Sequence, residues 1–476
     1  MKQNRAPIYE ALVQFRDQHP LSFHVPGHKN GTVFAEKGKA FFEKGLSLDL
    51  TELPGLDDLH APTGAIREAQ QLLSSFYQTD RSWFLVGGST VGNLAMVRAA
   101  CGKGDQVLVA RNCHRSVLNG IKLAGARPVF LRPRLDPESG LATAPSEDTV
   151  KEALIRYPDV RALLLTNPNY YGMAANIRSL IDQAHDHGLP VLVDEAHGAH
   201  FTAGPPFPES ALRCGADAVV HSAHKTLPAM TMGAYLHVQG GRISQQDVSE
   251  ALSMLQSSSP SYPIMASLDL ARCYLAQLTE TRLRAIHQDY KRIRERLGDF
   301  AYFGLIQGKS TAYEALDPLK ITIQMKNSLN GFEISQRLEQ EGIYPELADP
   351  DHVLFVLPLA RFQEDDRLIK AMENVLHGID PKAGRSTPVY PQGPRISCPA
   401  DITKDQEKKT VPLEEGIGRL AAQEVTPYPP GVPLIIRGER ITSAQIDAIQ
   451  YWHAAGGRFQ DGSDVVENGI HVVMRE

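Results

Sequence analysis

The chain has few cysteines and no excess of positive charge. Its five cysteines are scattered over 476 residues, and none forms the C-x-x-C pair of a zinc knuckle or redox motif. We therefore expect reduced thiols in a cytoplasmic protein. The 49 basic and 55 acidic residues give a net charge of −6, which argues against nucleic acid or an acidic membrane as a partner.

Long hydrophobic runs and a nucleotide-binding loop are also missing. No segment approaches the roughly 18 apolar residues of a membrane span, and the N-terminus has no apolar core of signal-peptide length. A P-loop ending in the one GKS, at Gly308, would need a glycine where Phe303 stands. The letters D-E-A-H at 194–197 therefore do not indicate an ATPase.

The chain does have alternating strand and helix patterns. Short apolar, β-rich runs alternate with helical stretches from Ser82 to about Val238. This alternation is typical of an α/β domain with a mainly parallel sheet, which binds ligands beyond the carboxyl ends of its strands. A long helix is predicted over residues 264–298, and strand patterns after it indicate a smaller α+β domain.

The predicted organisation has five parts. They are an N-terminal arm with a site loop (1–60), a large domain (61–300), a small α+β domain (301–380), a Pro- and charge-rich linker (381–412) and a C-terminal unit (413–476).

Polar residues gather where four of the strands end. The first end carries Gly88, Ser89 and Thr90 before a helix, where glycine, hydroxyls and a helix N-terminus suit a phosphate. The alternative is an ordinary helix cap. The second strand end carries His114, and a lone histidine is usually structural.

The other two ends carry more unusual residues. Asp194 ends "VLVD", with His197 and His200 beyond it. The last strand leads into "HSAHK", which contains Ser222, His224 and Lys225. A lysine at a buried strand end loses solvation, and such lysines have lowered pKa values and form Schiff bases.

Together these residues match the needs of pyridoxal 5'-phosphate (PLP). A carboxylate such as Asp194 keeps the pyridine nitrogen protonated, so the ring accepts electrons. His114 would lie on the ring face, and Lys225 would hold the aldehyde as an imine. The phosphate would bind three hydroxyls, those of Ser89, Thr90 and Ser222. The alternative is a metal site on Asp194, Glu195, His197 and His200, or on His24 and His28. We expect no metal, because Asp194 has the better role beside the cofactor.

Six motifs, occurring in order, resemble the Orn/Lys/Arg decarboxylase family. They are "FHVPGHKNG", "DLTELPGLDDLHAPTGAIREAQ", "RNCHRSV", "VDEAHGAHF", "SAHKTLPAMTMGAYLH" and "PYPPGVPLIIRGERIT". The resemblance runs from about Pro7 to Ile441, and it is to the short bacterial branch without the N-terminal wing domain. It implies PLP fold type I, the aspartate aminotransferase-like fold.

The resemblance also implies residue roles. The imine lysine falls on Lys225, the pyridine aspartate on Asp194 and the stacking histidine on His114. His197 would lie near the phenolic oxygen, with His224 beside the lysine. The phosphate hydroxyls fall on Ser89, Thr90 and Ser222. The family's phosphate turn usually reads G-T-[ST], and in this chain Gly88 replaces the threonine.

The implied reaction is decarboxylation of lysine, arginine or ornithine to cadaverine, agmatine or putrescine, as in polyamine biosynthesis. The substrate would displace Lys225, and His224 or Lys225 would return a proton after carbon dioxide leaves. We expect a homodimer or larger homo-oligomer with shared active sites. Residues 255–263 are expected to line the site.

The distal cation of the substrate needs an acid. The candidates are Glu52, Asp57 and Glu346, with Asp58 and Asp349 beside them. Each could instead be a solvated loop acid, and Asp57 or Asp58 could cap the next helix. Two rival functions stay open: another PLP enzyme, such as an aminotransferase with Arg361 or Arg437 as carboxylate clamp, and a non-catalytic PLP-fold protein.

Overall fold

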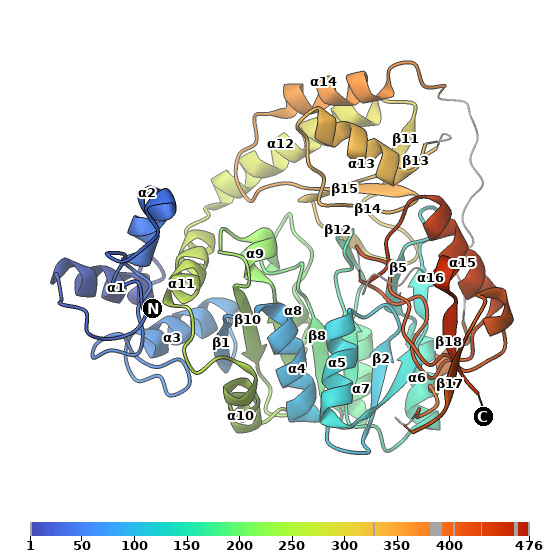
Figure 1. Ribbon diagram of the computed structural model, residues 1–476, viewed down its shortest axis with the longest axis horizontal. Coiled ribbons are helices and arrows are strands. Elements are labelled where there is room, and N and C mark those ends of the chain that lie inside the picture. The colour runs from blue at the N-terminus through green and yellow to red at the C-terminus, as the bar shows by residue number, and fades with distance from the viewer. Residues whose placement is uncertain are drawn as a thin grey trace.

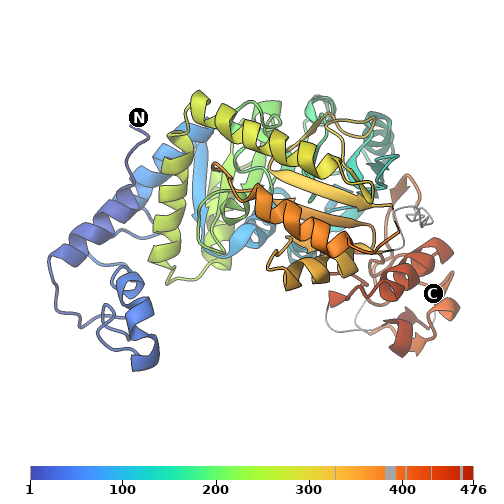
Figure 2. The ribbon, with the colours of Figure 1, turned by 90° about the horizontal axis from the view of Figure 1, so that it is seen from above.

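The computed structural model describes residues 2–326, 329–380, 393–402, 405–429, 431–460 and 465–474. A large α/β domain occupies the middle of the molecule, a small α+β domain lies above it, and the C-terminal unit flanks it (Figure 1). The N-terminal arm projects on the side away from the C-terminal unit, as the view from above shows (Figure 2).

The large domain is built on an eight-stranded sheet in the order β1-β10-β9-β8-β6-β2-β3-β16. Its strands are β1 (Arg81–Leu85), β2 (Gln106–Ala110), β3 (Arg127–Leu131), β6 (Leu163–Thr166), β8 (Val191–Asp194), β9 (Ala218–His221), β10 (Ala234–Val238) and β16 (Ile396–Ser397). The five strands from β9 to β3 are parallel to one another, while β10 and β16 are antiparallel to their neighbours. The expected mainly parallel sheet is confirmed.

Helices cover both faces of this sheet, which explains its continuous apolar strands. All four residues of β8 are buried, for example, including Asp194. One face packs against α4 (Gly88–Ala100), α5 (Arg115–Ala124) and α10 (Gln245–Leu255). The other packs against α3 (Ala65–Tyr77), α6 (Glu147–Arg156), α7 (Arg178–Asp186), α8 (Ala211–Cys214) and α11 (Tyr262–Ala276).

Short elements complete the large domain. They are the hairpin of β4 (Pro133–Leu135) and β5 (Ala142–Pro145), β7 (Met173–Ala174), the 3-10 turn η1 (Phe201–Ala203) and α9 (Ala223–Thr226). The strand β7 pairs with β12 (Ala315–Leu316) of the following domain, with Ala174 opposite Ala315. This pairing fixes the two domains against each other beside the carboxyl end of the sheet.

The small domain has an antiparallel sheet in the order β11-β13-β15-β14. Its elements are α12 (Glu280–Gly298), β11 (Phe303–Leu305), β13 (Lys320–Met325), α13 (Gly331–Gln340), β14 (Leu347–Ala348), β15 (His352–Val356) and α14 (Asp365–Leu376). The prediction of one helix over 264–298 is wrong. The helix α11 ends at Ala276, and α12 starts after Thr279, whose side chain accepts from Arg282 N and caps it.

The C-terminal unit is small and has its own apolar core. It contains β17 (Lys408–Val411), η2 (Glu414–Gly416), α15 (Ser443–Ala454), α16 (Val465–Asn468) and β18 (Ile470–Val473). Of the predicted linker, residues 381–392 and 403–404 lie outside the described residues. The rest of it contains β16, which joins the large-domain sheet, and β17, which pairs with β18.

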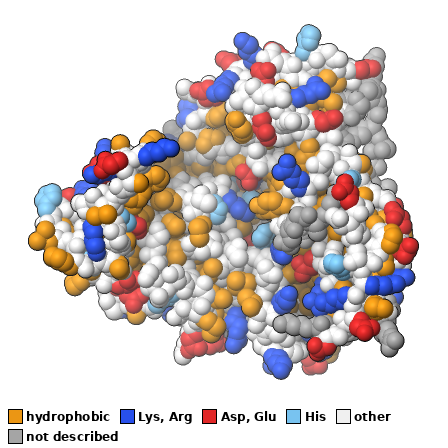
Figure 3. Space-filling view, viewed as in Figure 1, with side chains coloured by type: hydrophobic (Ala, Val, Ile, Leu, Met, Phe, Trp, Pro, Cys, Tyr) orange, Lys and Arg blue, Asp and Glu red, His pale blue; other side chains and the backbone are white. Residues whose placement is uncertain are grey.

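The N-terminal arm carries α1 (Pro7–Asp17) and α2 (Glu36–Leu46). The helix α2 buries none of its residues. Leu21, Phe23 and Phe41 are 86%, 93% and 92% exposed, and apolar side chains gather on the arm in Figure 3. Isolated exposed apolar residues are normal, whereas large contiguous clusters of them often belong to interaction surfaces. In the described part of the chain, no helix has the length and apolar character needed to cross a membrane.

Candidate active site

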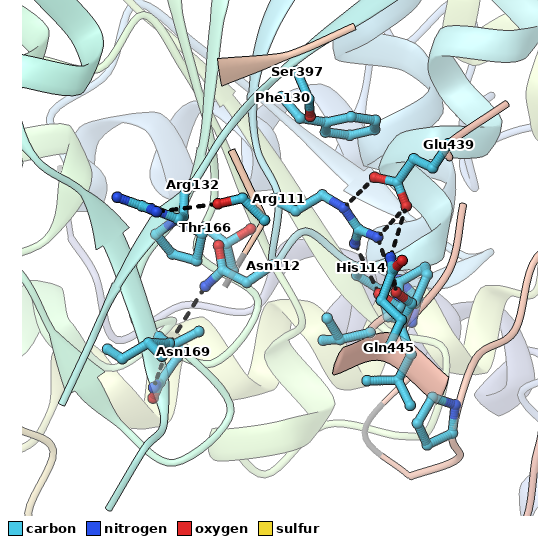
Figure 4. A pocket seen from close by; sticks show the side chains of 18 of the residues that line it. Arg111, Asn112, His114, Phe130, Arg132, Thr166, Asn169, Ser397, Glu439 and Gln445 are labelled. Carbon is cyan, nitrogen blue, oxygen red and sulfur yellow. Dashed lines mark hydrogen bonds and ion pairs between the residues drawn. The ribbon is translucent and has the colours of Figure 1, made fainter. Parts of the chain in front are cut away.

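A cavity of about 830 Å³ opens at the carboxyl ends of the central strands. From the large domain it is lined by Ser89, His114, Asp194, His197 and Lys225, all of which the sequence singled out. Its far wall comes from the C-terminal unit, where Glu439 accepts from the guanidinium of Arg111 (Figure 4). The cavity therefore lies where ligands of open α/β sheets bind.

Asp194 is buried and held by two donors. The side-chain amide of Asn93 donates to Oδ2 at 2.8 Å, and the backbone N–H of Ala196 donates to Oδ1 at 3.1 Å. Asn93 comes from α4, so the helix that begins at the candidate phosphate turn also orients this carboxylate. A fixed, buried carboxylate facing a cavity is suited to hold a protonated ring nitrogen.

His114 is oriented through Ser116, which is itself a partner of Asn93. Its Nδ1 accepts from the backbone N–H of Ser116 and lies 2.8 Å from Ser116 Oγ, which also accepts from Asn93. Burial lowers the pKa of His114, although the nearby Asp194 opposes the change. The ring is therefore an uncharged, fixed planar group on the cavity wall, as a stacking residue must be.

The predicted phosphate turn has a helix N-terminus and two linked hydroxyls. Ser222 Oγ, fully buried, donates to Ser89 Oγ at 2.7 Å, whereas Thr90 is exposed. Gly88 has φ +75°, a region that a threonine enters only with strain. The replacement of the family's threonine by glycine therefore agrees with the local backbone.

Lys225 points at His197 and Tyr170. Its Nζ lies 3.0 Å from His197 Nε2 and 4.9 Å from the centre of the Tyr170 ring. Burial lowers the pKa of Lys225, against the opposing charges of Asp194 and Glu346. A lowered pKa increases the fraction of the lysine that is an uncharged amine, which is the form that attacks an aldehyde. Its neighbour His224 is turned away, with Nδ1 2.9 Å from Gly233 O.

The candidate acids for a distal cation fall in different places. Glu346 is exposed and is not among the described residues that line the cavity, but its charge opposes the lowering of the pKa of both Lys225 and Lys320. Asp57 accepts from five backbone N–H groups, that of Asp58 and those of Thr63, Gly64, Ile66 and Arg67 around the start of α3. These contacts favour the alternative role for Asp57, which is to cap the following helix.

The remaining acids have structural partners or lie elsewhere. Asp349 accepts from Tyr171, from the ring of His352 and from the backbone N–H groups of 351 and 352. Asp58 accepts from the backbone N–H of His60. Glu52 is exposed at the base of the arm, near Tyr262.

Other predicted features lie away from the cavity. Arg361, one possible carboxylate clamp, donates to Asp289 at 2.5 Å. The other, Arg437, donates to the carbonyl oxygen of Ile402. Residues 255–263 connect α10 to α11 and are not part of the cavity wall formed by this chain's described residues.

Four functional candidates were missed by the sequence analysis: Asn93, Ser116, Tyr170 and Lys320. Asn93 carried a usable signal, because it lies one turn after Ser89 on the same helix. Tyr170 follows "LLLTNP", another strand end of the same sheet. Lys320 is 1% exposed at the start of β13, so a charged residue opening the apolar strand "KITIQM" was the available signal.

Comparison with known proteins agrees with this geometry. The family model described as Orn/Lys/Arg decarboxylase, major domain, matches residues 6–306, and the model of the family's C-terminal domain matches residues 397–461. The arginine decarboxylase of Bacillus subtilis is 34% identical and covers 100% of this chain and 99% of its own. The chain belongs to the Orn/Lys/Arg decarboxylase family.

Two further relatives extend the comparison. A Bacillus subtilis protein called "Uncharacterized protein YaaO" is 43% identical over 99% of both chains. The solved structure of lysine decarboxylase A from Pseudomonas aeruginosa covers 98% of this chain and 80% of its own, with a TM-score of 0.80 at 21% identity. This last likeness confirms the expected fold.

The family is that of PLP-dependent decarboxylases of basic amino acids, and this chain is such an enzyme. Its residues fit the cofactor. A half-buried amine, a buried carboxylate held by two donors and a hydroxyl-bearing helix N-terminus surround one cavity. These are the three groups needed to bind an aldehyde, a ring nitrogen and a phosphate.

Proposed function

We propose that this decarboxylase acts on arginine, with Lys225 as the cofactor-bearing lysine and Asp194 as the partner of the pyridine nitrogen. The observation that carries the residue assignment is the convergence of Lys225, Asp194 and His114 on one cavity. Arginine is the first choice because the Bacillus subtilis relative named arginine decarboxylase is 34% identical over the full chain.

The residues that would hold the cofactor follow from the geometry. Ser89, Ser222 and the N-terminus of α4 would bind its phosphate, with the backbone of Gly88 forming the turn. Asp194 would hold the ring nitrogen, and His114 would support the ring face. PLP, when bound, supplies a ring that accepts the electron pair left by the departing carboxylate.

The chain's own residues then handle protons. Lys225 Nζ faces the cavity, so we assign it the proton that returns to the substrate's α-carbon. His224, the other candidate, lies with Nδ1 2.9 Å from the Gly233 carbonyl oxygen and is a less direct donor. His197 and Tyr170 keep the Lys225 amine in place.

The distal cation of the substrate would meet Glu346, the acid whose charge acts on both Lys225 and Lys320. Glu52 would serve only in the site of a second copy, because the arm projects on the side away from the C-terminal unit, which forms a wall of the cavity (Figure 2). We propose a homodimer or larger assembly in which the exposed arm residues Leu21, Phe23 and Phe41 become buried. A cytoplasmic location is part of the proposal and is supported by the five unpaired cysteines.

The test is carbon dioxide release from PLP-loaded protein given arginine, lysine and ornithine separately. We expect release from arginine and at least tenfold less from the other two. Lys225→Ala should abolish release, while Lys122→Ala, on the exterior of α5, should leave it unchanged. Release from lysine or ornithine alone would overturn the choice of arginine, and an active Lys225→Ala variant would overturn the assignment of the lysine.

A further inference from the structure

His197 lies between two lysines that come from different domains. Its Nε2 is 3.0 Å from Lys225 Nζ, and its Nδ1 is 3.3 Å from Lys320 Nζ. Lys320 begins β13 of the small domain and is 1% exposed. The role proposed above for Lys225 involves its contact with Nε2 of this ring. It does not explain why Lys320 contacts Nδ1.

The two contacts constrain the protons of the three groups. Burial lowers the pKa of His197 well below its usual value, and the charges of Lys225 and Lys320 add to the effect. An uncharged imidazole has one N–H donor and one acceptor nitrogen, and an ammonium group only donates. Both contacts are hydrogen bonds only if the lysine that faces the ring N–H is an uncharged amine, whereas the lysine that donates to the other ring nitrogen can be an ammonium.

The carboxylates around the two lysines favour Lys320 as the ammonium. Burial lowers its pKa to about 8, against the opposing charges of Asp317 and Glu346. Asp317 is fully buried and lies 3.0 Å from His200 Nε2, so a fixed carboxylate stays beside Lys320. The corresponding acid of Lys225 is Asp194, both of whose oxygens already accept hydrogen bonds, from Asn93 and from the backbone of Ala196, whereas Asp317 Oδ2 has no hydrogen-bond partner among the described residues.

We propose that Lys320 is a positioning residue: its ammonium donates to Nδ1 of His197, so the imidazole proton stays on Nε2 and faces an uncharged Lys225 amine. The small domain thereby keeps Lys225 as an uncharged, nucleophilic amine, which would attack the aldehyde when the cofactor is loaded and would displace the product amine after turnover. This inference rests on the proposed role of Lys225. It also gives a function to His197 and His200 of the "DEAHGAH" segment.

The packing keeps Lys320 in this position. Gly172 has φ +84°, and a Cβ at Gly172 would lie 2.6 Å from Lys320 Cγ. The loop that carries Tyr170 therefore presses directly on the lysine stem, and the Tyr170 ring lies 4.4 Å from that of His197. The charged or titratable groups that act on His197 are Lys225, Lys320, His114 and His224, with Tyr170 in ring contact; those that act on Lys320 are Asp317, Glu346 and Lys225.

The first test is the pH dependence of PLP capture by PLP-free protein, followed by absorbance. Without the donor at Nδ1, the His197 ring is free to accept from a charged Lys225. We therefore expect Lys320→Met to slow capture about tenfold at neutral pH and to move the pH profile up by about one unit. Lys320→Arg keeps a cationic donor and should restore most of the rate.

A matched control comes from the same strand. Thr322→Val alters a buried side chain two residues further along β13 whose hydroxyl has no hydrogen-bond partner among the described residues. It should leave capture unchanged. Equal rates in Lys320→Met and the unaltered protein, or equal losses in Lys320→Met and Thr322→Val, would overturn the proposal.

The second test reads the His197 tautomer directly, by ¹⁵N NMR of histidine-labelled, PLP-free protein with the signal assigned through His197→Asn. We expect the proton on Nε2, and a shift toward Nδ1 in Lys320→Met. A proton on Nδ1 in the unaltered protein would refute the proposal. Since this measurement needs no turnover, failure to release carbon dioxide from any amino acid would overturn the proposed function and leave the Lys320 assignment standing.

Discussion

The ion pair between Arg111 and Glu439 joins the C-terminal unit to the large domain at the cavity wall. The Arg111 guanidinium donates to both carboxylate oxygens at 2.8 Å, and also to the carbonyl oxygens of Pro433 and Leu434. The two side chains are 19% and 13% exposed. Removing the cation should therefore loosen the unit and open one side of the active site.

The magnitude follows from these contacts. Two charge-assisted hydrogen bonds at roughly 1.5–3 kcal/mol each, reduced by the partial exposure of the pair, give a loss of about 3 kcal/mol in Arg111→Met. That is roughly a hundredfold in the equilibrium between the closed and open unit. Glu439→Gln should lose a similar amount, and the double variant should lose less than the sum because the two groups interact.

Native-state hydrogen exchange measures this opening. The Ala421 amide donates to the backbone carbonyl of Glu439, the residue that Arg111 holds in place, and should exchange about a hundredfold faster in Arg111→Met. Arg127→Met is the matched control, because Arg127 pairs with Asp401 across the same two parts at 3.9 Å, with side chains 61% and 76% exposed. Exchange within threefold of the unaltered protein in Arg111→Met would refute the reasoning.

Three further predictions concern the turn, the arm and the small domain. Gly88→Thr should weaken PLP binding about tenfold, because a β-branched residue at φ +75° costs roughly 1–2 kcal/mol. Equilibrium dialysis measures the binding constant, and an unchanged constant would contradict the prediction. Phe23→Ser with Phe41→Ser should lower the mass measured by light scattering to that of a monomer, whereas Leu123→Ser, 65% exposed on α5, should not. Hydrogen bonds from Arg292 and Arg296 lower the pKa of Asp365 to about 2, so their stabilisation is present above about pH 4 and is lost as the pH falls toward 2. Asp365→Asn should therefore lower the melting temperature at pH 7, and the difference from the unaltered protein should vanish in acid; a constant difference would contradict the assignment.

The sequence predicted the large domain well because its signals were local. Each strand end that we predicted from a polar cluster is a strand end in the structure. The segments "VLVD" and "AVVH" form neighbouring parallel strands. Parallel strands bring their carboxyl ends to one edge, so residues such as Ser89, Asp194 and Lys225 meet there without any further information. Gly88 likewise has the backbone conformation that its residue type suggests.

The remaining features depend on contacts between distant segments. Lys320 reaches His197 across 123 positions of the chain, and Asn93 reaches Asp194 across 101. No periodicity reveals such pairs, because they depend on how the small domain and α4 pack on the sheet. The break between α11 and α12 was missed for the opposite reason: Thr279 is a local cap inside a continuous helical pattern.

The short strand β16 covers the backbone edge of β3 in the large sheet. It pairs with β3 along the outer side of the large sheet, with Ile396 opposite Leu131 and Ser397 opposite Phe130. An unpaired β3 would offer its backbone N–H and C=O groups to any other extended chain, and exposed edges of this kind promote aggregation. Truncation before residue 393 would therefore remove a safeguard against self-association, and expression of the large and small domains alone would be expected to yield insoluble protein.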